Sequence, residues 1–355
     1  MDTGVATQPT KMDVFLGRML DDMGAAAAGA LVLVGDRLGL FAALADTGPC
    51  DAATLARRAK TQPRLTAEWL AAMAASGYVT LADGRYSLSP EQQAVFADEA
   101  GPAFLAGFFD VAAACWRDEP KLTEAFRGDG KLGWHEHNVC LFRGTERFFR
   151  TSYRHHLVQE WLPALEGMIA RLNAGAVVAD VGCGHGASTI LMAQAFPASR
   201  FIGWDYHGAS IETARRTAER AGLANTRFEV ATAQDFPEED GGYDLIAFFD
   251  CLHDMGDPTG AARRAREVLK PDGTLMVVEP MARDRLEDNL NPVGRIYYAA
   301  STLICTPASL SQDGAAGLGA QAGPARLTQV LRDGGFGRVR VATETPFNII
   351  LEARP

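Results

Sequence analysis

Residues 177–186 read VVADVGCGHG, an apolar run that reaches Asp180 and then enters a turn with Gly182 and Gly184. With Ala187, the turn fits the G-x-G-x-x-G/A pattern, in which small residues let the backbone come close to a bound nucleotide. Asp180 bears on the charge of that ligand. A carboxylate at the mouth of the turn repels a pyrophosphate, whereas it stabilises an ammonium or a sulfonium group. The residues therefore favour a positively charged ligand.

Asp205 supplies a second acid about 20 residues further along, at the end of the next expected strand. An acid in that position can accept hydrogen bonds from the two hydroxyls of a ribose. S-adenosylmethionine combines a ribose diol with an ammonium and a sulfonium, so it satisfies both Asp180 and Asp205. Two other interpretations stay open. Asp180 can be a helix-capping or strand-end acid without a ligand, and the glycine pattern alone fits a nicotinamide-dependent dehydrogenase, which Asp180 disfavours.

A regular alternation of strands and helices after residue 173 must position these acids. Candidate strands of mostly apolar residues occupy 176–181, 200–205, 226–231, 243–250, 273–279, 338–343 and 347–353. Helical segments such as SIETARRTAERAGL and GAARRAREVLK fill the gaps. This rhythm predicts an α/β fold with a Rossmann-like, doubly wound sheet of seven strands, mostly parallel, with the last strand antiparallel. Ligands of such sheets bind at the carboxyl ends of the strands, where both acids are expected.

The first hundred residues have a different pattern, with helices followed by a hairpin. Helical patterning runs from 12 to about 45, Asp51 can cap a following helix, and a further helix ends at Gly77. Two short strands around Asp83-Gly84 complete the order of a winged helix. The segment RLTAEWLAAMAAS, in the recognition position, has one arginine and a mainly apolar surface, unlike a helix that contacts base edges. We therefore expect this helix to pack against a partner subunit.

Three segments follow from these patterns. We expect a winged-helix-like dimerisation domain at 1–100, a helical linker and substrate lid at 101–172, and a cofactor-binding catalytic domain at 173–355. The linker contains the loop GWHEHN, whose His135 and His137 have a spacing that suits a metal. No clear carboxylate–histidine frame accompanies them, so we expect no metal and assign the loop to the lid.

The net charge and the cysteine content limit the kind of partner and the cellular compartment. The chain has 355 residues, 47% of them hydrophobic, and a formal net charge of -10, which disfavours a partner gripped through its phosphates, such as a nucleic acid. Its six cysteines form no C-x-x-C pair, as expected of reduced thiols in the cytoplasm. The start MDTGVATQPTKMDVF lacks a secretory pattern, and the apolar stretch 25–35 is too short to span a membrane.

The segment 177–279 resembles the class I S-adenosylmethionine-dependent methyltransferases. VADVGCGHG resembles their first motif, FIGWDYH their ribose-binding strand end and FEVATAQDFP their adenine segment, while YDLIAFFDCLHDMGDP and LKPDGTLMVVEP resemble the fourth and fifth strands. The resemblance places Ala233 and Gln234 beside the adenine and Asp250 beneath the methionine, although many members have an acid where this chain has Thr232. The cofactor-binding residues that it implies are Asp180, Gly182, Gly184, Asp205, Ala233, Gln234 and Asp250.

The layout of the whole chain resembles the dimeric O-methyltransferases of small molecules. In that family the sequence HDW follows the fourth strand and its histidine is the base, and here CLHDMGDP places His253 and Asp254 there. The resemblance implies that His253 is the general base, and its ordinary pKa near 6.5 suits that role. The alternative is a purely structural His253. Neighbouring side chains of an extended segment point apart, so we expect a more distant acid such as Glu279, in place of Asp254, to orient His253.

Together these patterns predict an enzyme that transfers a methyl group from S-adenosyl-L-methionine to a small organic acceptor. Oxygen is the favoured acceptor atom, with nitrogen and carbon open, and we expect a homodimer joined through the first hundred residues. The alternative is a winged-helix transcriptional regulator that senses S-adenosylmethionine or another ligand. The acidic net charge and the apolar recognition helix weigh against that alternative.

Overall fold

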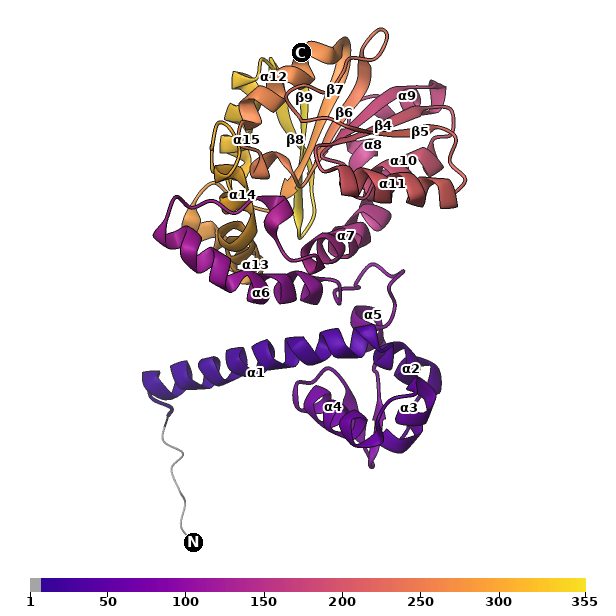
Figure 1. Cartoon of the computed structure of the whole chain (residues 1–355), viewed down its shortest axis with the longest axis vertical. Coiled ribbons are helices and arrows are strands. Elements are labelled where there is room, and N and C mark those ends of the chain that lie inside the picture. Colours follow the sequence, from indigo (N-terminus) through magenta and orange to yellow (C-terminus); the bar gives the residue numbers. More distant parts are fainter. Residues whose placement is uncertain (1–7) are drawn as a thin grey trace. The chain divides into compact units, whose positions relative to one another are not determined.

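The computed structural model describes residues 8–355, which divide into two compact units (Figure 1). The first unit extends to Ala113 and includes Phe142–Thr151, and the second comprises Ala114–Leu141 and Ser152–Pro355. Helices α6 (Phe108–Arg127) and α7 (Cys140–Ser152) each contribute residues to both units. The chain therefore connects the two units through helical segments.

The first unit has the helix, helix and hairpin order of a winged helix, as predicted. Its elements are α1 (Lys11–Arg37), α2 (Leu40–Thr47), α3 (Ala52–Ala59), α4 (Pro63–Ala75), β1 (Thr80–Ala82), β2 (Arg85–Ser87) and α5 (Pro90–Phe96). Asp51 caps α3, because its carboxylate accepts a hydrogen bond of 2.7 Å from the Thr54 backbone N–H. The hairpin turns at Asp83 and Gly84, whose φ angles of 48° and 71° are those that a two-residue type I′ turn requires.

Helices α1, α2 and α4 enclose the core of this unit. Trp69 of α4 contacts Phe41 edge to face, with ring centroids 5.0 Å apart, and its indole N–H donates to the Leu31 carbonyl at 2.9 Å. A Cβ atom at Gly35 of α1 would lie 2.5 Å from the Trp69 ring, so only glycine lets α1 come this close. These contacts fix α1 against α4 near the carboxyl end of α1.

The second unit contains the predicted seven-stranded sheet, in the order β5-β4-β3-β6-β7-β9-β8. The strands are β3 (Val177–Val181), β4 (Arg200–Asp205), β5 (Thr226–Val230), β6 (Tyr243–Phe249), β7 (Leu269–Pro280), β8 (Arg338–Glu344) and β9 (Asn348–Arg354). The last strand, β9, pairs antiparallel with both of its neighbours, and the pairs among β3 to β7 are parallel. The strand boundaries agree with the prediction to within one residue except at the start of β7, which begins at Leu269 because that residue already pairs with Tyr243 before a break in register.

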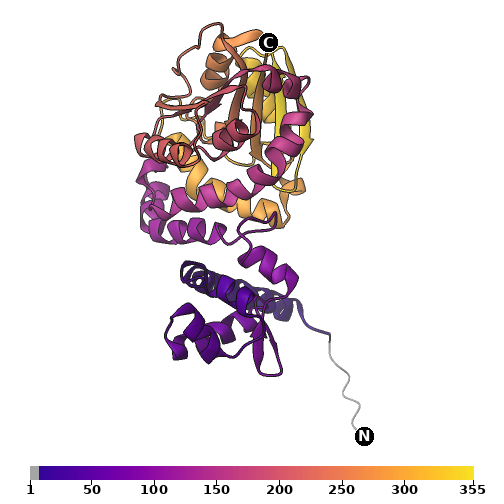
Figure 2. The same ribbon diagram turned by 90° about the vertical axis from the view of Figure 1, so that its right-hand side faces the viewer.

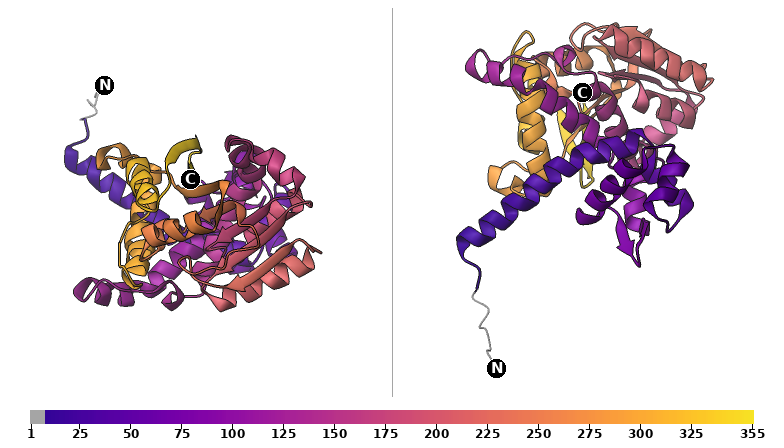
Figure 3. Two further views of the ribbon diagram at one scale, coloured as in Figure 1. Left: turned by 90° about the horizontal axis from the view of Figure 1, so that it is seen from above. Right: turned by 60° about the horizontal axis from the view of Figure 1, so that its bottom comes forward.

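Helices cover both faces of this sheet (Figure 2 and Figure 3). They include α10 (Ala187–Ala195), α11 (Gly208–Arg220), α12 (Pro258–Val268) and α15 (Gly323–Asp333), while α13 (Pro292–Ala300) and α14 (Thr306–Leu310) lie beyond the edge of the sheet in Figure 1. Strand β6 is buried along nearly its whole length, as expected of a parallel strand with both faces covered. Its carboxyl end is therefore held rigidly, and that end carries the candidate site.

Short helical segments of the linker complete the second unit. They are the 3-10 turn η1 (Trp134–Glu136), the π-helix η2 (Tyr153–Trp161), α8 (Leu162–Ala164) and α9 (Met168–Ala174). A second π-helix, η5 (Ser301–Cys305), joins α13 to α14. Single π-helical turns often occur at functional sites, and both of these turns place a side chain near the carboxyl ends of the strands.

Among residues 8–355, no single helix is both long and apolar enough to cross a bilayer. Helices α1 and α2 reach the required length and composition only as a pair, which is bent by 69°.

Candidate active site

The glycine turn after β3 has the conformation that its sequence predicts. Gly182 and Gly184 have φ angles of 77° and 53°, in the left-handed region. A Cβ atom at Gly182 would lie 2.7 Å from the Cys251 sulfur, so a side chain is excluded there by space as well as by conformation. The Gly182 N–H donates to the Trp204 carbonyl at 2.7 Å, which ties the turn to the end of β4.

Asp180 is fully buried and divides its two oxygens between two environments. Oδ2 accepts hydrogen bonds of 2.6 Å from the Ser188 and Thr189 hydroxyls at the start of α10. Oδ1 is buried and has no hydrogen-bond partner among the described residues. Burial raises the pKa of Asp180 to about 6, although the two hydroxyls act in the opposite direction. One oxygen therefore serves the helix start, and the other lacks the donor that a buried carboxylate requires.

Asp205 lies at the end of β4 and contacts the glycine turn directly. Its Oδ2 accepts from the Gly184 N–H at 2.9 Å, and its Oδ1 accepts from the His207 N–H at 2.8 Å. Burial raises the pKa of this carboxyl above its ordinary value. Each carboxylate oxygen has two lone pairs, so both oxygens can accept one further hydrogen bond. The structure thus brings Asp205 and Gly184 together.

Ala233 and Gln234 lie on the loop that follows β5. The backbone of Ala231 donates to the Asp205 carbonyl at 3.2 Å, which places the start of this loop beside the end of β4. Ala233 is partly buried against the core, and the Gln234 amide donates to the Asp257 carbonyl at 3.2 Å. The two residues therefore share an edge of the sheet with Asp205.

Asp250 follows β6 and is held by two residues that the sequence analysis did not assign to the site. Its Oδ2 accepts from the Tyr153 hydroxyl and its Oδ1 from the Asn348 amide, both at 2.8 Å. The φ angle of Asp250 is 50°, a left-handed conformation that is uncommon for a residue with a side chain. Burial, followed by the nearby Glu279 carboxylate, raises the pKa of Asp250 to about 8.

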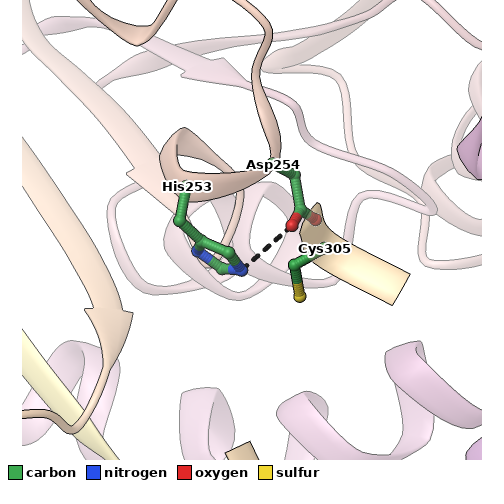
Figure 4. A group of neighbouring side chains, drawn as sticks. All are labelled: His253, Asp254 and Cys305. Atoms are coloured by element: carbon green, nitrogen blue, oxygen red, sulfur yellow. Dashed lines mark ion pairs between the residues drawn. The ribbon is translucent and has the colours of Figure 1, made fainter. Parts of the chain in front are cut away.

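His253 lies in the 3-10 turn η3 (Leu252–Asp254) and is only 3% exposed. Its Nδ1 lies 2.5 Å from Glu279 Oε2, and Glu279 Oε1 accepts from the Leu252 N–H at 3.0 Å. The expectation that Glu279 accompanies His253 is confirmed by this contact. The expectation that Asp254 points away is wrong, since Asp254 Oδ1 lies 3.1 Å from His253 Nε2 (Figure 4). The segment is a tight turn rather than extended, so consecutive side chains can converge.

The two carboxylates beside His253 determine its charge. Burial alone would lower the pKa of His253, but the Asp254 and Glu279 carboxylates outweigh it and raise the pKa well above its ordinary value. The two carboxylates therefore favour the protonated imidazole. Cys251 precedes η3 and contacts the glycine turn. Burial, followed by the nearby Glu279 and Asp180 carboxylates, raises the pKa of the Cys251 thiol well above its usual value.

The two histidines of the linker loop have different surroundings. His137 is buried, with Nδ1 3.0 Å from Asp118 Oδ2, whereas His135 is exposed. A cavity of about 430 Å³ lies elsewhere, between residues 281–293 and 344–346. No predicted site residue lines that cavity, so the buried carboxylates define the candidate site.

Two family models and a curated relative match this chain. Residues 172–335 match the family described as "Methyltransferase domain", and residues 26–97 match the "Rv2258c-like winged HTH domain". O-methyltransferase SfmM3 of Streptomyces lavendulae is 30% identical over 271 residues, which cover 72% of this chain and 77% of that protein. Five other curated relatives align over only 33% to 53% of their own length.

Two solved structures share the fold over nearly the whole length of both chains. The structure described as "PigF with SAH" is 20% identical with a TM-score of 0.72, and covers 98% of this chain and 100% of its own. Human N-acetylserotonin methyltransferase in complex with SAM is 17% identical with a TM-score of 0.71, and the match covers 98% of this chain and 99% of that chain. At such low identity these likenesses show the fold alone.

The fold and the acids around the glycine turn define an enzyme of the methyltransferase class. The chain belongs to the S-adenosylmethionine-dependent methyltransferases that carry an N-terminal winged-helix domain.

Proposed function

We propose that the protein transfers the methyl group of S-adenosyl-L-methionine to an oxygen atom of a small organic acceptor. The observation that carries the proposal is the buried, unpartnered Oδ1 of Asp180 beside the glycine turn. A buried carboxylate oxygen without a donor is unfavourable, and a bound ammonium supplies that donor together with a compensating charge. The resemblance to O-methyltransferase SfmM3 supports oxygen over nitrogen and carbon.

The cofactor-binding residues have separate tasks in this proposal. When bound, S-adenosylmethionine supplies an electrophilic methyl group on a sulfonium. Asp180 stabilises the positive methionine end, Asp205 accepts from the ribose hydroxyls, and Gly182 and Gly184 keep side chains away from the ligand. Ala233 and Gln234 flank the adenine, and Asp250 lies beneath the methionine, held by Tyr153 and Asn348. These residues hold the donor in line with the acceptor, which is the main requirement of a displacement at carbon.

His253 is the proposed general base. Glu279 orients the ring through Nδ1, so Nε2 is the atom that would take a proton from the acceptor hydroxyl. The Asp254 carboxylate lies beside Nε2 in this structure. The Asp254 side chain must therefore rotate away before an acceptor can approach Nε2. Because a base must be neutral, loss of the Nε2 proton has to precede catalysis.

The winged helix does not support the alternative function of a transcriptional regulator. The arginine of its recognition helix, Arg64, pairs with Glu68 on the same helix, which offsets the charge that DNA would require. We propose in its place that residues 1–100 form the dimerisation domain, that 101–172 form the linker and lid, and that 173–355 bind the cofactor. The six cysteines form no C-x-x-C pair, which supports a cytoplasmic location.

Helix α1 supports a homodimer. Its apolar side chains recur every three to four residues along one stripe and are exposed in the structure: Met12, Phe15, Leu16, Met19, Leu20 and Met23. Phe15 is 58% exposed and Leu20 is 68% exposed. A continuous apolar stripe of this kind marks a subunit interface.

Light scattering tests the dimer. The double variant Phe15→Glu/Leu20→Glu should have the mass of a monomer at micromolar concentration, because two charges would be buried in the interface. Leu81→Glu, at a 52% exposed position on the hairpin, is the matched control and should remain a dimer. A wild-type protein that is already a monomer would refute the proposal.

Titration calorimetry and a product assay test the activity. The protein should bind S-adenosylmethionine and S-adenosylhomocysteine but not NAD, and a panel of phenols and other hydroxylated compounds should identify an acceptor through formation of S-adenosylhomocysteine. Asp205→Ala should weaken cofactor binding roughly ten- to hundredfold, since each lost hydrogen bond to a charged group costs about 1.5–3 kcal/mol. Binding of NAD without any response to the sulfonium cofactor would refute the proposal.

A further inference from the structure

A nitrogen, an oxygen and a sulfur ligand converge at the end of β6. One ligand atom from each of His253, Asp254 and Cys305 lies within 4.8 Å of the other two (Figure 4). The first two residues belong to the turn η3, and Cys305 is the last residue of the π-helix η5. Imidazole, carboxylate and thiolate together form the mixed donor set that suits Zn²⁺.

Glu279 supplies the outer contact that a metal-binding histidine requires. Its carboxylate lies 2.5 Å from His253 Nδ1, and the Leu252 N–H fixes its other oxygen. With Nδ1 held by Glu279, Nε2 points to the side of the ring where Asp254 lies and becomes a ligand atom once its proton is lost. Histidine ligands of metals almost always donate their second N–H to a carboxylate or a carbonyl in this way.

The charges of the cluster also favour a cation. Two carboxylates, Asp254 and Glu279, flank a single imidazole, and Asp254 Oδ1 is buried and lies 3.1 Å from His253 Nε2. His253 and Cys305 are buried, whereas the Asp254 side chain is 22% exposed, so the cluster is partly exposed on the Asp254 side. Ligand type, ligand number, outer contact and partial exposure are thus four features that this cluster shares with metal sites.

We propose that His253 Nε2, Asp254 and Cys305 bind a divalent cation of the zinc class, with Glu279 as the outer partner and one coordination position open to water. Binding releases the thiol proton and the Nε2 proton to solvent, because both atoms must be deprotonated to act as ligands. The occupied site has no free Nε2 lone pair. If His253 is the base, as the proposed function holds, zinc inhibits methyl transfer.

Cobalt spectroscopy tests the site without an acceptor. Titration of the metal-free protein with Co²⁺ should give a thiolate-to-cobalt charge-transfer absorption with a stoichiometry of one ion per chain, and Zn²⁺ should displace it. Cys305→Ser should abolish the absorption. Cys115→Ser, a half-buried cysteine outside this group, is the matched control and should retain it.

The outcomes separate the metal site from the enzymatic proposal. Cofactor affinity, measured by calorimetry, shows whether each variant is folded, since Cys305 has no proposed part in cofactor binding. No charge-transfer absorption at micromolar Co²⁺ would overturn the site, as would an absorption that persists in Cys305→Ser. With an acceptor from the panel, Zn²⁺ should abolish turnover of the wild type and spare Cys305→Ser. Zinc binding without inhibition would refute the inhibitory role and leave the metal site standing.

Discussion

Replacement of Asp180 by asparagine should stabilise the empty protein at high pH and weaken cofactor binding. Asparagine keeps an oxygen that can accept from the Ser188 and Thr189 hydroxyls, so the start of α10 retains its contacts. It removes the negative charge, which is unfavourable in a buried position without a cation. The substitution therefore tests whether Asp180 is present for the ligand rather than for the fold.

The magnitude follows from the pKa of Asp180, which burial raises from 3.8 to about 6. A raised pKa means that the folded state binds the proton more tightly than the unfolded state. The stability that this group contributes is therefore fully present below about pH 4 and is lost as the pH rises through about 6. The complete change corresponds to about 3 kcal/mol at 1.36 kcal/mol per pKa unit. About 1.4 kcal/mol of it falls between roughly pH 5 and pH 8.

Urea unfolding of both proteins at a series of pH values measures this term. The difference in the free energy of unfolding, Asp180→Asn minus wild type, should increase by about 1–1.5 kcal/mol from roughly pH 5 to pH 8. Any constant effect of the new amide cancels, because only the change with pH is compared. Asp244→Asn, at an acid on β6 that lies in an ion pair with Lys270, serves as the control and should not show this increase.

Calorimetry with S-adenosylmethionine provides the second half of the test. The variant should bind the cofactor roughly ten- to hundredfold more weakly, which corresponds to the loss of about 1.5–3 kcal/mol for a hydrogen bond to a charged group. Two results would refute the reasoning: a stability difference that does not depend on pH, or unchanged cofactor affinity. In either case Asp180 would serve mainly as the acceptor for the two hydroxyls of α10.

Three further predictions concern the residues around the turn η3. Tyr153→Phe removes the donor to Asp250 and should lower the free energy of unfolding by about 1–3 kcal/mol in urea titrations; unchanged stability would mean that this bond contributes nothing. His253→Gln should reduce turnover about a hundredfold or more with unchanged cofactor affinity, and a rate that barely changes across the pH range would make His253 structural. The pKa of His253, measured by NMR of its ring nitrogens, should be lower with S-adenosylmethionine than with S-adenosylhomocysteine bound. Equal pKa values would mean that the sulfonium charge does not act on His253.

The sequence predicts the sheet closely because its signals are local. Each strand of the second unit is an apolar run bounded by turn residues, and the acids Asp180 and Asp205 occur at strand ends, so the edge on which they meet follows from the parallel topology. The hairpin at Asp83-Gly84 is equally local. The sequence predicts that β7 begins at residue 273, whereas the strand begins at Leu269. Leu269 pairs with Tyr243 of a neighbouring strand, and the sequence of β7 alone does not reveal that pairing.

The partners of Asp250 and His253 could not be found in this way, because they come from distant parts of the chain. Tyr153 is in a π-helix of the linker, Asn348 begins the last strand, and Cys305 ends a second π-helix. Nothing in a sequence distinguishes the tyrosine that reaches an acid from one that only fills the core. The contact of Asp254 was missed for a different reason, since a 3-10 turn over three residues has no clear periodicity.

The charges at the end of β6 connect cofactor binding with proton transfer. The Asp254 and Glu279 carboxylates exceed the single positive charge of His253, and together with burial of Asp250 they raise the pKa of both Asp250 and His253. A ligand with a sulfonium adds positive charge nearby and should therefore lower the pKa of His253, which favours the neutral base only while the methyl donor is bound. Methyl transfer removes the sulfonium charge, and the proton taken from the acceptor returns one positive charge to the imidazole. The carboxylates that stabilise the donor before transfer can thus stabilise the imidazolium after it, and the charge of the site stays constant through the reaction.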